Sequence, residues 1–174
     1  MSLASPLQGV ASPGTSYVAQ VLATQAAGET DPTWHWGIHG HSRRSVTQER
    51  LLAFARRRLI ELMAADSAYR VETLAARTAN ALLIEIVDAD QPTPQVFPAG
   101  GNAVKVEWLV NDVEEQITVF PDGGVVWLLD PVGDRPGVDR ETALGDPEAV
   151  LLIEELKARL DILAQDLAAR HPHI

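Results

Sequence analysis

Residues 104–130 constrain the fold of this chain more than any other stretch, because they contain three consecutive strand patterns. In residues 104–110, apolar and charged side chains alternate, which is the period-two pattern of a half-buried strand. Residues 115–120 and 124–129 are rich in β-branched, aromatic and other apolar side chains. The region therefore predicts three adjacent strands of one sheet.

Short turn-forming sequences separate these strands. Asn111 and Asp112 tolerate a left-handed backbone. Residues 121–124, Pro-Asp-Gly-Gly, combine a proline that fixes φ with glycines that accept positive φ. Both links predict tight hairpins, so the strands form an antiparallel meander. Its apolar face needs a cover, because a small isolated sheet is only marginally stable in water.

Two helices before the meander are the natural cover. The first is predicted at residues 45–65, where Ser45 and Gln48 stand at capping-box spacing and apolar residues recur every three to four positions. The second is predicted at residues 68–88, and residues 95–98 are the candidate for a short edge strand. The expected fold is α+β, with two helices packed on a three- to four-stranded antiparallel meander, and residues 43–131 form this domain.

The C-terminal part predicts a polar linker at residues 132–146 and a helix at residues 147–170. Asp146 and Pro147 are a strong helix start, with an N-cap acid followed by proline at the first helical position. The charged residues of this helix, Arg159 among them, are expected on its wet face. Its apolar residues follow heptad spacing and predict a partner-binding or self-associating seam, formed by Ile153, Leu156, Leu160, Leu163 and Leu167.

Residues 1–42 are rich in Ala, Ser, Thr, Gly and Pro, a composition that buries little apolar surface and predicts a mobile arm. Trp34 and Trp36 interrupt this composition. Tryptophan is a large anchor in protein interfaces. The two residues are therefore candidate contacts with a partner or with the body of the domain.

The same arm holds a histidine cluster. Three neutral imidazoles suit zinc, so a metal-dependent enzyme at His35, His39 and His41 is one alternative function. Gly37 and Gly40 favour a loop instead, and the chain contains no cysteine to complete a ligand set. No nucleophile elbow or phosphate-binding glycine loop is present, so the sequence predicts neither a catalytic group nor a cofactor.

A second alternative is a nucleic-acid-binding regulator. Residues 43–58 contain six arginines against one glutamate. The candidate phosphate contacts are Arg43, Arg44, Arg50 and Arg57. Residues 91–174, in contrast, carry six basic and fifteen acidic side chains, and this part of the chain repels nucleic acid and anionic membranes.

Other features of the composition indicate the cellular compartment. The chain of 174 residues fits one domain with appendages, and its lack of cysteine fits a reducing environment. No Lys or Arg occurs in the first 28 residues, and no apolar run approaches the ~20 residues of a membrane span. A cytoplasmic protein that does not enter the membrane is the expectation.

Residues 92–130 resemble a group of short bacterial proteins with no known activity. In these proteins a helix ends at a Pro-Thr-Pro-like stop, and a Gly-Gly turn, a Glu-Trp strand and an Asp-Gly turn follow. The matching positions here are Pro92, Pro94, Gly100, Gly101, Glu107, Trp108, Asp122 and Gly123. The resemblance covers about a quarter of the chain and implies an antiparallel meander after a helix. It carries over no site residue.

Together these patterns favour a non-catalytic protein-interaction module, antitoxin-like or an assembly partner. Its partner is expected to be another protein or a second copy of the chain. The C-terminal seam and the aromatic arm are the expected contacts.

Overall fold

The computed structural model describes residues 45–66 and 69–170. Its elements confirm the α+β class. In chain order they are α2 (Val46–Ala64), α3 (Thr73–Ile86), β1 (Gln95–Ala99), the short 3-10 turn η2 (Gly100–Asn102), β2 (Ala103–Val110), β3 (Val113–Val119), β4 (Gly124–Leu129), β5 (Val138–Ala143) and α4 (Pro147–Arg170).

The strands form one antiparallel sheet in which each strand pairs with its neighbour in sequence, in the order β1-β2-β3-β4-β5. The predicted turns are present. Asn111 and Asp112 have φ values of 50° and 67°, and Gly123 has a φ of 90°. These left-handed conformations match the twist of the flanking strands, so the predicted hairpins are confirmed.

The structure differs from the sequence prediction at residues 132–146, which were expected to form a linker. They contain β5, which pairs with β4 along its whole length. Half of the six β5 side chains, those of Asp139, Arg140 and Glu141, are charged and exposed, so the strand lacks the apolar alternation by which the other strands were recognised. Charged residues are typical of an edge strand, because they discourage pairing with another chain.

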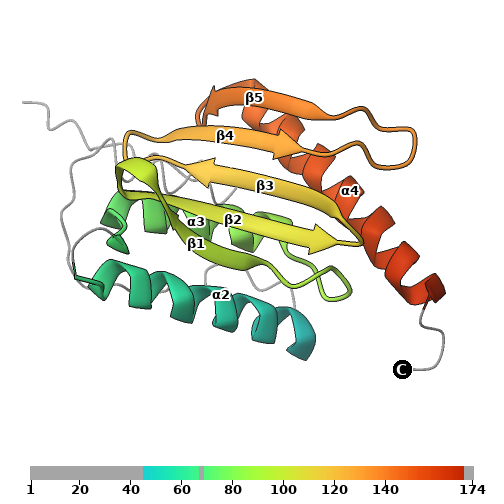
Figure 1. Cartoon of the computed structure of the whole chain (residues 1–174), viewed down its shortest axis with the longest axis horizontal. Coiled ribbons are helices and arrows are strands. Elements are labelled where there is room, and N and C mark those ends of the chain that lie inside the picture. Colours follow the sequence, from blue (N-terminus) through green and yellow to red (C-terminus); the bar gives the residue numbers. More distant parts are fainter. Residues whose placement is uncertain (1–44, 67–68, 171–174) are drawn as a thin grey trace, which may run out of the picture.

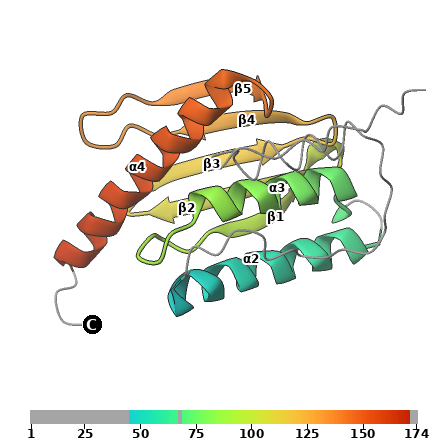
Figure 2. The ribbon, with the colours of Figure 1, turned by 180° about the vertical axis from the view of Figure 1, so that it is seen from behind.

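Among residues 45–66 and 69–170, the helices cover one face of the sheet and leave the other open. Figure 2 shows α3 and α4 lying across the covered face, and α2 packs beside α3 near β1. Figure 1 looks onto the opposite face, on which none of the described helices lies. The predicted cover of the meander is therefore present, and α4 is part of it.

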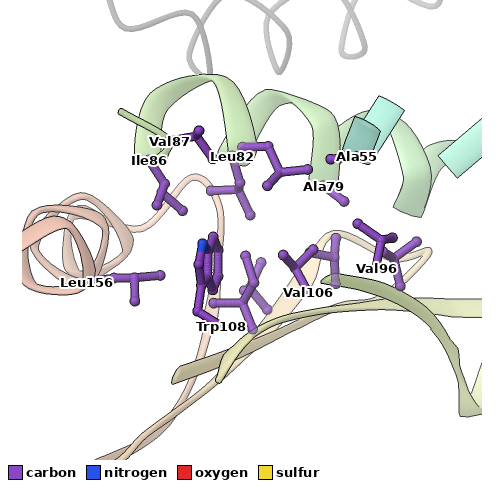
Figure 3. Packing of buried hydrophobic residues seen from close by; sticks show 14 of the residues in the cluster. Ala55, Ala79, Leu82, Ile86, Val87, Val96, Val106, Trp108 and Leu156 are labelled. Carbon is purple, nitrogen blue, oxygen red and sulfur yellow. The ribbon is translucent and has the colours of Figure 1, made fainter. Parts of the chain in front are cut away.

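The core lies between the sheet and these helices. Its largest members, Trp108 and Trp127, are fully buried on the covered face. Trp108 points toward α3 and lies near Ile86, with Leu156 of α4 at its side (Figure 3). Alanines of α3, such as Ala79, let the helix approach the sheet closely.

Two helix starts depend on local hydrogen bonds. Ser45 caps α2, because its hydroxyl accepts from the Gln48 amide at 3.1 Å. The Gln48 side chain does not return to the cap and donates instead to the Val87 carbonyl at 2.8 Å. α3 begins later than predicted, since the amide of Glu72 donates to the carbonyl of Asn102 and holds the preceding backbone extended.

Candidate functional site

The predicted seam of α4 packs inside the core of the same chain. Four of its residues are buried and the fifth is partly buried against the same cluster: Ile153, Leu156, Leu160, Leu163 and Leu167. In this conformation the seam residues pack against the sheet and α3. A partner that used these residues would have to displace α4.

Arg159 lies between the seam leucines, and the prediction that it faces water was wrong. Its side chain is fully buried, because the position faces the sheet as Leu156 and Leu160 do. The guanidinium donates to the backbone carbonyls of Asp130 and Pro136, just after β4 and just before β5. It also donates to the Glu155 carboxylate at 2.9 Å. Arg159 therefore ties α4 to the β4–β5 connection.

Glu115 of β3 is the buried acid opposite this arginine. One of its carboxylate oxygens lies 3.6 Å from Nη1 of Arg159, and neither oxygen has a hydrogen-bond partner within the described residues. Burial raises the pKa of Glu115 to about 7, against the opposing effect of the Arg159 charge, and the carboxylates of Asp130 and Glu155 raise it further. The acid is therefore poised between its protonated and ionised forms near neutral pH.

Glu115 makes the stability of the fold depend on pH. The raised pKa means that the folded state holds a proton that the unfolded state releases, so stability is greatest below the unfolded value of 4.5 and is lost as the pH rises through about 7. The loss is up to about 3 kcal/mol. We expect Glu115→Gln to flatten urea-unfolding free energies measured between pH 5 and pH 8. Glu114→Gln, on the open side of β3, should keep the slope, and an equal slope in both variants would contradict this assignment.

An outer pair completes the buried cluster. Arg135, in the β4–β5 connection, donates to the second carboxylate oxygen of Glu155. Glu155 therefore bridges Arg135 and Arg159 and neutralises part of the buried positive charge. Among residues 45–66 and 69–170 no group of three His, Cys, Asp or Glu side chains is placed to hold a metal ion. The contacts of this cluster hold α4 against the β4–β5 connection.

The second feature is the open sheet face, on which alternate side chains of all five strands point away from the helices. Four apolar residues larger than alanine lie there: Phe97, Leu109, Val126 and Leu128. Five charged residues accompany them: Lys105, Glu107, Glu114, Asp139 and Glu141. One positive and four negative charges give this face a net charge of −3.

The apolar side chains of the open sheet face are unequally exposed. Leu109 and Leu128 are 55% and 41% exposed. Phe97 is half-buried beneath Lys105, whose ammonium lies 5.1 Å from the ring centre and 2.5 Å from the Glu107 carboxylate. Val126 and Leu128 adjoin along β4 and lie opposite the carboxylates of β5. The open sheet face therefore presents apolar side chains with carboxylates beside them.

The third feature is the outer face of α2, defined by Val46, Arg50, Phe54, Arg57 and Ile60. These residues lie opposite the buried stripe of the helix. Arg50 and Arg57 are seven positions apart and share this exposed face, as the nucleic-acid hypothesis requires of them. Arg57 also pairs with Glu61 at 3.2 Å. The outer face of α2 is thus apolar, with Arg50 and Arg57 against the single carboxylate of Glu61.

Several predicted site residues lie outside the described residues. They are Trp34, Trp36, His35, His39, His41, Arg43 and Arg44. The structure therefore leaves the aromatic contact, the histidine metal site and the two leading arginines as predictions. None of the helices in the described part of the chain is long and apolar enough to cross a bilayer.

Sequence reasoning missed the buried pair, although the signal was present. Glu115 shares the inward phase of β3 with Ile117 and Val119, and period-two alternation places all three on the covered face. Arg159 follows Leu156 by three positions and lies on the same side of α4. An acid and a base that both face the core are expected to pair there, because an unpaired buried charge is costly.

Comparison with profiles of known protein families, with curated proteins and with solved structures gives no significant match for this chain. The candidate surfaces therefore rest on the geometry alone.

Proposed function

We propose that this protein is a non-catalytic protein-interaction module whose docking surface is the open sheet face. One observation carries the proposal: the helices cover one face of the sheet, whereas Leu109 and Leu128 stay exposed among carboxylates on the other. A sheet face that only meets water is typically polar at every outward position. Exposed apolar side chains rimmed by charge are instead typical of interaction sites.

The negative charge of the open sheet face indicates what kind of partner would bind there. Four carboxylates against one ammonium favour a segment that carries arginine or lysine beside its apolar residues. Such a segment is an amphipathic helix with a basic flank, because helices already pack on the other side of this sheet. The seam of α4 and the aromatic arm are not needed for this contact.

Strand addition at a sheet edge is the less favoured mode. β1 contains Pro98, which lacks the amide that a pairing strand needs. β5, at the other edge, exposes three consecutive charged residues, Asp139, Arg140 and Glu141. Docking on the face avoids both obstacles.

The proposal predicts that Leu128→Asp weakens binding of a synthetic amphipathic helix of leucine and arginine by about tenfold or more, or 1.4 kcal/mol. The reason is that the change removes an apolar contact and buries a carboxylate on binding. Fluorescence anisotropy of the labelled peptide measures the affinity. Leu151→Asp, at a still more exposed leucine of α4, is the matched control and should bind as the unaltered chain does.

Two outcomes of this experiment would reject the proposal. The first is no binding of the basic peptide by the unaltered chain. The second is equal binding of a peptide in which glutamate replaces every arginine, because the acidic face should discriminate against it.

A nucleic-acid-binding role is the second candidate function. The observation that favours it is the shared exposure of Arg50 and Arg57 on α2. Phosphate contacts by these arginines would give a gel shift that weakens steeply as salt is added. No shift at low salt with either DNA or RNA, or a shift unchanged in Arg50→Gln/Arg57→Gln, would reject this role.

A further inference from the structure

The outer face of α2 and the open sheet face are complementary surfaces on the same chain. The first presents Arg50 and Arg57 beside Phe54 and other exposed apolar residues. The second presents apolar residues framed by carboxylates and carries a net charge of −3. The chain thus contains the basic amphipathic helix that its own sheet face is suited to bind.

We infer that the open sheet face of one molecule binds the outer face of α2 of a second copy. The inference rests on the proposed function and deepens it by naming the partner. Arg50 and Arg57 lie in this contact against the carboxylates of Asp139 and Glu141, and Phe54 packs on the ridge of Val126 and Leu128.

The dimensions of the two surfaces agree. The 19 residues of α2 make a helix of about 28 Å at 1.5 Å per residue. The 8 residues of β2, the longest strand, extend about 26 Å at 3.3 Å per residue. One helix therefore spans the sheet from end to end along the strands.

Charge disfavours the symmetric arrangements. Two open sheet faces placed together would oppose a charge of −3 with another of −3. Two α2 outer faces, each with Arg50 and Arg57 against Glu61, would oppose one net positive charge with another. Like charges across an interface cost several kcal/mol. The mixed contact, helix against sheet, is the one in which both surfaces find opposite charges.

A contact between two different surfaces leaves one of each kind unused in every pair. Head-to-tail contacts of this type continue into a chain of molecules or close into a ring. The assembly therefore grows with concentration. It weakens with salt, because surface charges are screened.

Sedimentation velocity of the full chain, measured over a concentration series at low salt, tests the inference. We expect the average mass to rise with concentration and to fall on addition of salt. Arg50→Glu/Arg57→Glu reverses the helix surface, and Asp139→Lys/Glu141→Lys reverses the sheet surface. Each variant alone should associate at least about tenfold more weakly. The matched controls Lys157→Glu and Glu154→Lys change charge on α4 and should associate as the unaltered chain does.

Mixing the two variants gives the decisive result. The helix variant keeps an intact sheet face and the sheet variant keeps an intact α2, so one natural contact forms again and the mixture associates. Circular dichroism of each variant checks that it is folded. A monomer at all concentrations, or unaltered association in both variants, would overturn the inference.

The outcome also separates this inference from the proposed function. If the unaltered chain stays monomeric yet binds the leucine–arginine peptide through Leu128, the docking surface stands and only the self-association fails. If it neither associates nor binds the peptide, both are rejected.

Discussion

Replacing Arg159 with methionine is expected to lower the free energy of unfolding by about 3–5 kcal/mol at pH 8, because it leaves the buried Glu115 without the positive charge that favours its ionised form. The change also leaves two backbone carbonyls, those of Asp130 and Pro136, without their donor. The cost should be smaller at pH 5, where Glu115 is protonated. Urea unfolding followed by circular dichroism at both pH values measures the effect.

Two further variants test the cause of this loss. Lys157→Met removes a positive charge two positions earlier on the solvent side of α4 and should change stability by less than about 0.5 kcal/mol. Glu115→Leu/Arg159→Met removes both buried charges, and it should recover much of what Arg159→Met loses. A double variant as unstable as the single one would show that the carbonyl contacts, and not the charge of Glu115, dominate the loss.

Trp108→Ala is expected to destabilise the fold by about 3–5 kcal/mol, because it opens a cavity where the sheet meets α3 and α4. Chemical denaturation of the full chain measures this change. Leu128→Ala, on the open face, is the control and should cost far less, since its side chain is already 41% exposed.

The two buried tryptophans should respond differently to phenylalanine. Trp127 donates its indole N–H to the Thr142 hydroxyl at 2.9 Å, whereas the indole nitrogen of Trp108 has no hydrogen-bond partner in the described residues. Trp127→Phe therefore also loses a buried hydrogen bond, worth about 1 kcal/mol. A greater loss in Trp108→Phe than in Trp127→Phe would contradict this distinction.

The sequence predicted the central strands because their local signals agree with the tertiary structure. Asn111, Asp112 and Gly123 have the left-handed geometry that their residue types favour. The alternation in residues 104–110 places Trp108 in the core, as its phase requires. Local pattern and global packing select the same conformation here.

The strand β5 and the outward face of the sheet could not be predicted in the same way. The pairing of β5 is set by β4, and its own polar sequence carries no strand period. Heptad spacing in α4 identified an apolar face correctly, but the same spacing serves an intramolecular core as well as a coiled coil. Which surface remains free depends on where α3 and α4 dock, and that is a property of the assembled fold.

The position of α4 after all five described strands bears on when the contact between Arg159 and Glu115 can form. α4 follows every strand in the chain, so on a ribosome the sheet is made before Arg159 is available to Glu115, which lies 44 positions earlier. In a sheet without α4, the Glu115 carboxylate would face water on the surface that α4 covers. A hydrated charge at that place opposes non-native apolar contacts with the unfinished sheet. Docking of α4 would then replace that water with the guanidinium of Arg159.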